Sequence, residues 1–187
     1  MHPARTWAPP VVKFVPFNYG EVAVKCMDYA QILPKVFVGS HPHVNEDIDS
    51  LLRDLGVTAV LNLQTDEDMI TADVNWKPLE SHYQTSTLHL FRVPMKEEQV
   101  VLREKLFECI HTLDRLLAAG HTVYLHCTAG IARSPTVAIG YLHYYLCWEL
   151  DAAIDHVMRV RQCSPHLEAL RLAIMDQEKL ESAKQGR

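Results

Sequence analysis

The sequence predicts an α/β fold, with a twisted and largely parallel sheet of four or five strands flanked by helices. Short β-branched and aromatic runs alternate along the chain with segments whose apolar residues recur at helical spacing. The last of these short runs opens into a loop of small residues that leads into a helix, as at the ligand-binding edge of many parallel sheets. The 187 residues, 48% of them hydrophobic, suffice for one domain with a sizeable core.

The first two predicted strands, residues 35–39 and 57–63, enclose a helix. Asn45 is its predicted N-cap, acidic residues in its first turn favour the helix dipole, and Gly56 is its predicted end. A strand, a helix and a strand in this order predict a parallel pairing of the two strands.

The segment 64–86 has few apolar positions and predicts a long excursion with helical pieces, a kind of segment that is often functional. After it the pattern predicts strands at 87–93 and 122–126 and helices at 102–119, 134–147, 151–162 and 166–184. Four prolines within residues 1–28 predict an irregular N-terminal extension, so the folded domain is expected over residues 29–187.

Composition argues against several classes of protein. The formal net charge is -5, from 18 basic and 23 acidic residues, so neither a nucleic-acid partner nor a membrane surface is expected. No apolar run approaches the ~18 residues of a membrane helix, and the first residues lack the apolar core of a secretory signal. The five cysteines form no Cys-x-x-Cys pair, which argues against a metal site and for a reducing compartment. A cytoplasmic protein without cofactor is therefore expected.

One motif carries chemistry, because Cys127 is followed by five residues and then Arg133 where the strand at 122–126 passes into a helix. The five residues are short enough to curl into a cradle whose backbone N–H groups face a bound anion. The residues of this predicted cradle are Thr128, Ala129, Gly130, Ile131 and Ala132. The N-terminus of the helix adds its dipole, so Cys127 is expected to be a thiolate nucleophile at neutral pH. Arg133 supplies a planar fork for two phosphoryl oxygens.

Each of these assignments has a structural alternative. Cys127 could be a buried core cysteine and Arg133 a surface charge, but the preceding apolar strand, the small residues and the following Ser-Pro favour the cradle. His126 could tune the thiolate or be a strand-end histidine satisfied by backbone. Ser134 could donate a hydrogen bond to the leaving thiolate or only cap the helix.

Beyond the motif, the sequence resembles the dual-specificity branch of the cysteine phosphatases, and within it the glucan phosphatases, which are laforin-like and plant starch-phosphatase catalytic domains. The resemblance covers about residues 29–177, and the opening Cys-Thr-Ala-Gly of the loop looks like the glucan-specific variant. It is carried by residues 32–40 (ILPKVFVGS), 56–65 (GVTAVLNLQT), 120–130 (GHTVYLHCTAG) and 161–165 (RQCSP). The resemblance implies the cysteine-phosphatase fold and metal-free dephosphorylation of starch or glycogen-like chains through a phosphocysteine intermediate. The alternative substrate is a phosphoprotein carrying phosphotyrosine, phosphoserine or phosphothreonine.

The sequence departs from the pattern of that family in two places. Ala132 stands where the family usually has glycine, which is expected to narrow the pocket slightly. The family also places an aspartate general acid some thirty residues before the cysteine, but residues 92–99 contain none. Glu97 or Glu98 could donate the proton instead, or both could belong to the solvated first turn of the next helix. If neither acts, a phosphate-binding scaffold with weak turnover becomes a third hypothesis.

Sugar binding would require aromatic platforms near the cradle. Trp76 and Tyr83 are the candidates, because aromatic side chains exposed in the polar segment 64–86 suggest a binding role. Alternatively, either side chain could simply anchor this segment to the core. If the substrate is starch, the resemblance also implies a plastid location, which would require that a transit peptide has been removed.

Overall fold

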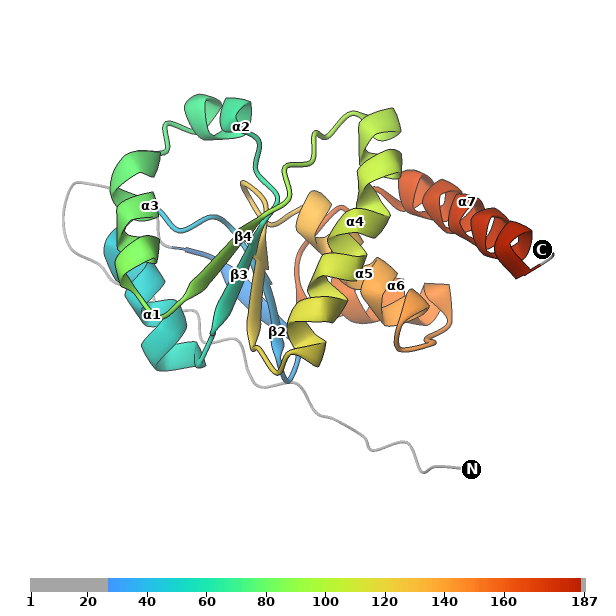
Figure 1. Cartoon of the computed structure of the whole chain (residues 1–187), viewed down its shortest axis with the longest axis horizontal. Helices are drawn as coiled ribbons and strands as arrows, with labels where there is room; N and C mark the ends of the chain where they lie inside the picture. The colour runs from blue at the N-terminus through green and yellow to red at the C-terminus, as the bar shows by residue number, and fades with distance from the viewer. Residues whose placement is uncertain (1–26, 186–187) are drawn as a thin grey trace.

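The computed structural model describes residues 27–185, which form a five-stranded sheet with helices on both sides (Figure 1). The strands are β1 (Tyr29–Leu33), β2 (Val36–Gly39), β3 (Ala59–Asn62), β4 (His89–Arg92) and β5 (Val123–His126). The helices are α1 (Asn45–Leu55), α2 (Asp66–Thr71), α3 (Trp76–Thr85), α4 (Gln99–Ala118), α5 (Arg133–Tyr144), α6 (Leu150–Val160) and α7 (Leu167–Gln185).

The strands lie in the order β1-β2-β5-β3-β4, and only β1 is antiparallel to its neighbour. The predicted α/β class and the largely parallel sheet are therefore confirmed. The predicted direct pairing of β2 with β3 is wrong, because β5 lies between them and is parallel to both. This insertion makes β5 the central strand, so the loop that follows it opens at the middle of the sheet edge.

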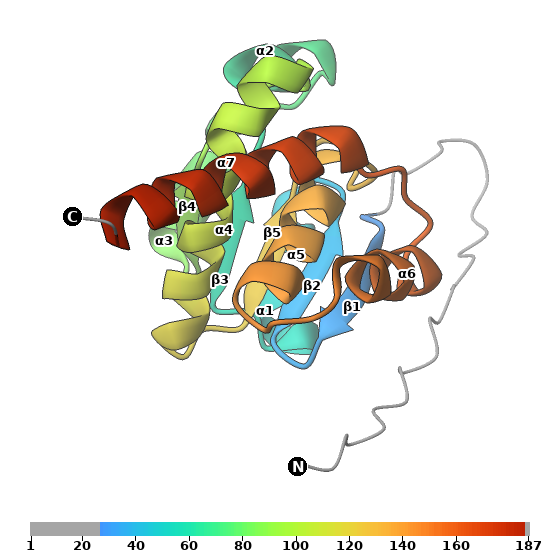
Figure 2. The same ribbon diagram turned by 90° about the vertical axis from the view of Figure 1, so that its right-hand side faces the viewer.

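Two cores cover the two faces of the sheet. Helices α4 to α7 pack on one face and helices α1 and α3 on the other (Figures 1 and 2). Side chains of β5 alternate between the two cores: Val123 and Leu125 belong to the first, and Tyr124 belongs to the second. This alternation follows from the period of two in a strand, and a central strand with both faces covered is apolar throughout.

Local signals explain most of the element boundaries. Gly56 ends α1 in a left-handed conformation with φ of 62°, as predicted, but the residue before the helix is Val44 and not Asn45. The N-cap residue makes no side-chain cap; instead the Asp47 carboxylate, at the third helical position, accepts hydrogen bonds from the backbone N–H groups of His43 and Val44 at 2.7 and 3.3 Å. The segment 64–86 holds α2 and α3, which confirms its helical pieces.

The predicted N-terminal extension, residues 1–28, lies almost wholly outside the described residues, which begin at Met27. Within residues 27–185, none of the helices combines the length and the apolar character needed to span a membrane.

Candidate active site

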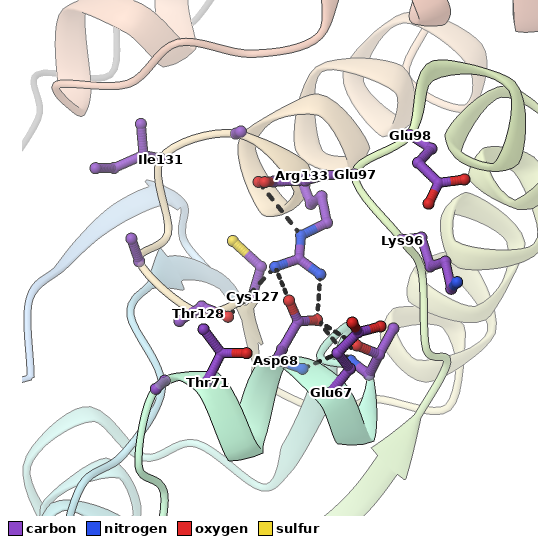
Figure 3. A pocket seen from close by; sticks show the side chains of 14 residues that line it. Glu67, Asp68, Thr71, Lys96, Glu97, Glu98, Cys127, Thr128, Ile131 and Arg133 are labelled. Carbon is purple, nitrogen blue, oxygen red and sulfur yellow. Dashed lines mark hydrogen bonds and ion pairs between the residues drawn. The ribbon is translucent and has the colours of Figure 1, made fainter.

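A cavity of about 670 Å³ opens at the carboxyl end of β5 and is lined by fourteen residues (Figure 3). Three segments contribute to it: residues 65–72 around α2, residues 96–98 before α4, and residues 127–133, which include Cys127 and Arg133. The sequence prediction placed the chemistry in the third segment and its two candidate acids in the second. Four of the five predicted cradle residues line the cavity. The fifth, Gly130, is buried behind it.

The backbone of the loop 128–132 is oriented with its carbonyl groups outward. Each of the five carbonyl oxygens accepts a hydrogen bond from outside the loop. The donors are His41 N to Thr128 O (3.0 Å), Arg161 to Ala129 O and Gly130 O, Ser164 N to Ile131 O (2.8 Å), and Thr136 N and Oγ1 to Ala132 O (3.1 and 2.8 Å). Within the described part of the chain, none of the N–H groups of residues 128–133 donates to another protein atom. These N–H groups are therefore available to an anion, as the cradle prediction requires.

Two small residues allow this loop to close. Gly130 has a φ of 68°, and a Cβ atom there would overlap the backbone of Gly39 and the guanidinium of Arg161. Ala132 has a negative φ of -114°, outside the left-handed region that favours glycine. The replacement of the family's usual glycine at Ala132 therefore leaves the loop conformation intact.

Arg161, at the end of α6, is only 4% exposed and binds the loop from behind. Its Nε donates to Gly130 O at 2.6 Å and its Nη2 to Ala129 O at 3.2 Å, while Nη2 also lies 3.2 Å from the Asp28 carboxylate. Because the guanidinium is planar and rigid, these bonds determine the direction of two adjacent peptide units. Arg161 was noted in the sequence only as part of the family resemblance, without a role.

We expect Arg161→Gln to weaken the binding of orthovanadate by about tenfold or more, since loss of one charge-assisted bond costs about 1.5–3 kcal/mol. The mutation leaves both carbonyls without their donor, so the loop N–H groups lose their common direction. Isothermal titration with orthovanadate measures the effect, with Arg171→Gln as the matched control, because Arg171 forms an exposed ion pair with Asp151. An unchanged affinity together with a lowered melting temperature would show that Arg161 only stabilises the fold.

Cys127 is 2% exposed, and its Sγ lies 3.4 Å from the Oγ of Ser134. Ser134 is completely buried, and α5 begins one residue earlier without a side-chain cap. The capping interpretation of Ser134 is therefore wrong, and the hydroxyl group is placed to donate a hydrogen bond to a thiolate. The following Pro135 lies in the first turn of α5, where no backbone donor is lost.

His126 is fully buried, and its Nδ1 lies 3.0 Å from Cys127 O. The carbonyl oxygen can only accept, so Nδ1 carries the proton. Burial, the largest cause, lowers the pKa of His126 to about 3. The imidazole is therefore neutral and contributes no positive charge to the sulfur. Backbone satisfies only Nδ1 of this histidine, because the buried Nε2 has no hydrogen-bond partner among the described residues.

Arg133 is 2% exposed and makes a bidentate ion pair with Asp68 of α2, at 2.6 Å and 3.2 Å. Its Nη1 also donates to Met95 O at 2.9 Å. Asp68 is itself held by a capping box with Thr65, whose N–H donates to the carboxylate at 2.7 Å. Burial opposes ionisation of Asp68, but the hydrogen bonds from Arg133 and Thr65 outweigh it and lower the pKa of the carboxyl group.

Sequence reasoning missed Asp68 as a site residue. The available signal was the Thr-x-x-Asp capping box directly after a predicted strand, which locates a helix start at the same sheet edge as Cys127. In the part of the chain that the structure describes, no group of three or more His, Cys, Asp or Glu side chains is arranged to hold a metal ion.

Asp68→Asn is expected to lower the free energy of unfolding at pH 7 by about 1–2 kcal/mol. The folded-state pKa of Asp68 lies below its unfolded value of about 3.9, so its contribution is complete above that value and is lost as pH falls through the folded pKa. The difference between wild type and variant should therefore shrink below pH 4. Urea unfolding from pH 2.5 to 7 measures it, with the exposed Asp155→Asn as control. A difference that does not change with pH would contradict the ion-pair assignment.

The structure separates the two candidate acids. Glu97 points toward Arg133, with its Oε1 3.6 Å from Nε, whereas Glu98 lies farther from the loop (Figure 3). Both residues precede α4, which begins at Gln99, so the expectation that they form its first turn is wrong. Glu98 is the N-cap residue, and its backbone carbonyl accepts from Leu102 N at 2.9 Å.

The two candidate sugar platforms lie away from the cavity. Tyr83 is 5% exposed and belongs to the core beneath α1 and α3, so the prediction that its face is exposed is wrong. Trp76 is partly buried against the same core, with the guanidinium of Arg92 5.1 Å above its ring. Neither lines the cavity, and none of the fourteen lining residues is aromatic. These contacts support the alternative interpretation, in which the two aromatic side chains hold the segment 64–86 against the core.

A parallel sheet whose central strand opens into a Cys-x5-Arg loop with inward N–H groups, followed directly by a helix, defines the class of cysteine phosphatase folds. The family model described as "Dual specificity phosphatase, catalytic domain" matches residues 36–178. The chain therefore belongs to the dual specificity phosphatase family.

Relatives and solved structures agree with this assignment. Phosphoglucan phosphatase LSF1 of Arabidopsis thaliana is 32% identical over 80% of this chain and 25% of its own length. Laforin of Mus musculus is 32% identical over 78% of this chain and 47% of its own length. The chain thus spans between a quarter and about half the length of these relatives. The crystal structure of PTPMT1 has the same fold, with a TM-score of 0.67 and 19% identity over 85% of this chain and 99% of that one.

Proposed function

We propose that this chain, with residues 29–187 as its catalytic domain, hydrolyses phosphomonoesters through a phosphocysteine intermediate. The proposal is carried by one observation: the backbone N–H groups of residues 128–133, which follow Cys127, donate to no other atom of the described protein. The Cys127 sulfur attacks phosphorus and forms the S–P bond while the bond from phosphorus to the leaving oxygen breaks. Arg133 and the loop N–H groups bind the three equatorial oxygens, where charge develops. Water then attacks phosphorus, the S–P bond breaks, and Ser134 donates a hydrogen bond to the departing thiolate.

Glu97 is the proposed proton donor to the leaving oxygen. Its carboxyl group is the closer of the two candidates to the guanidinium of Arg133, at 3.6 Å. Asp68 also faces the cavity, but its lowered pKa and its two bonds to Arg133 make it a poor acid. Glu97 thus takes the place of the aspartate that the family usually provides.

Glu97→Gln is expected to reduce kcat for an alkyl phosphate ester by about 10² or more, at the lower end of what general acid catalysis contributes. The reduction should be much smaller for p-nitrophenyl phosphate, whose leaving group needs little protonation. Steady-state kinetics on both substrates measure the difference, with Glu98→Gln as the matched neighbour. The assignment fails if Glu98→Gln shows the selective loss and Glu97→Gln does not, or if neither does.

Phosphorylated glucan is the proposed substrate class. The loop opens with Cys-Thr-Ala-Gly, and a relative 32% identical to the chain is named a phosphoglucan phosphatase. The cavity lining contains side chains that can hydrogen-bond to a hydroxyl-rich carrier of the phosphate, among them Thr65 and Thr71 of the α2 region. It offers no aromatic platform, so hydrogen bonds must replace stacking there. A role in carbohydrate metabolism in the cytoplasm follows, or in a plastid, since the relative is named chloroplastic.

We expect phosphate release from amylopectin to exceed release from a phosphotyrosine peptide, both measured by malachite green between pH 5.5 and 7.5. Cys127→Ser serves as the blank. Release from the peptide alone would move the substrate to phosphoprotein and leave the Cys127 chemistry standing. Equal and near-zero release by wild type and Cys127→Ser on both substrates, and on a phenyl phosphate, would favour the phosphate-binding scaffold.

A further inference from the structure

The cavity that surrounds the phosphate cradle has an unexpected balance of charge. Its lining contains four carboxyl side chains and two cationic ones, so its formal net charge is negative by two, or by one when Glu97 carries the proton that it donates. The carboxylates belong to Glu67, Asp68, Glu97 and Glu98, and the cations to Lys96 and Arg133. Arg133, the cation at the floor, is already paired with Asp68. The positive potential that attracts the phosphoryl group is therefore concentrated at the floor, on the Arg133 guanidinium and the loop N–H groups.

The remaining carboxylates stand on two walls that face each other. Residues 65–72 form one wall and residues 96–98 the other, and the loop 127–133 closes a further side of the cavity (Figure 3). Glu67 is exposed on the first wall and Glu98 on the second, and only Lys96 offsets them. A phosphoryl group seated over Cys127 must direct its carrier outward between these walls. The part of the carrier next to the phosphate therefore experiences a negative field from both sides.

We infer that this mouth selects phosphomonoesters whose carrier is uncharged or cationic beside the phosphate and rejects carriers that bear further anionic groups. The inference rests on the proposed function and deepens it by naming a substrate class. A hydroxyl-rich, uncharged carrier meets carboxylate acceptors on both walls. A second phosphate or a flanking carboxylate meets like charges at the same places. Glu67 and Glu98 are thus specificity-determining residues, distinct from the groups that bind the reacting phosphoryl.

The size of the effect follows from Coulomb's law. A like charge about 8 Å from one wall carboxylate lowers affinity between about twofold in bulk water and thirtyfold at the effective dielectric of a protein surface. The discrimination must also depend on salt, because at 1 M ionic strength the screening length is only ~3 Å. A preference that arises from shape would not change in this way.

The test uses three phosphotyrosine peptides that differ only in their flanking residues, which are Lys, Ser or Glu. Their kcat/KM values are measured with wild-type protein at 20 mM and 1 M salt. Their Kd values are measured by fluorescence anisotropy on Cys127→Ser, which retains the walls and reports binding whether or not turnover occurs. The expected order is Lys, then Ser, then Glu, with a ratio of about tenfold or more between the extremes at low salt and close to one at high salt.

Variants then assign the effect to the walls. Glu67→Gln and Glu98→Gln, alone and combined, should reduce the ratio between the Lys and Glu peptides, and any general loss of rate cancels in that ratio. Glu178→Gln, exposed on α7, is the matched control and should leave the ratio unchanged. Equal Kd values for the three peptides, or a ratio that Glu67→Gln and Glu98→Gln do not change, would overturn the inference. Discrimination in Kd together with no wild-type turnover of the peptides, of amylopectin or of a phenyl phosphate would support it and overturn the phosphatase proposal instead.

Discussion

The site depends on the outward orientation of five consecutive carbonyl groups in the loop 128–132. A loop that presents its N–H groups to an anion must direct its carbonyls into protein, where each needs a donor. Most of the donors come from places that are distant in sequence, namely the connection after β2, the end of α6 and the segment before α7, and Thr136 in the first turn of α5 supplies the rest. These elements meet only because β5 is inserted between β2 and β3. The sheet order is thus the condition for the chemistry.

The charged groups of the site are also held in place by their neighbours. Arg133 is buried, and a buried cation is tolerated only with a partner, which Asp68 provides. Asp68 in turn is oriented by Thr65 at the start of α2, so the guanidinium has a defined position before any phosphate arrives. His126 beside the nucleophile is neutral, so this histidine supplies no charge to the thiolate. Positive charge at the loop is therefore concentrated on one guanidinium and the loop dipoles.

Sequence reasoning succeeded where the signal was local. The strand, small-residue loop and helix around Cys127 are contiguous, so the Cys-x5-Arg spacing together with this local context predicted the cradle, and helical periodicity predicted α4 to α7. Asp68 and Arg161 were missed as site residues because their roles depend on contacts 65 and 31 residues away in the chain. Tyr83 was misjudged because polar neighbours in sequence do not reveal that α3 turns this ring into a core.

The same distinction separates catalysis from specificity. The floor of the cavity is built by the loop and by elements that hold it, and any change there alters the binding of every phosphate. The walls are built by residues 65–72 and 96–98, two connections that carry few of the loop's hydrogen bonds. Their exposed charges can change without disturbing β5 or α5, since surface substitutions away from packed contacts are usually tolerated. Substrate choice in this fold is therefore expected to vary at Glu67 and Glu98 while Cys127, Arg133 and the loop backbone stay the same.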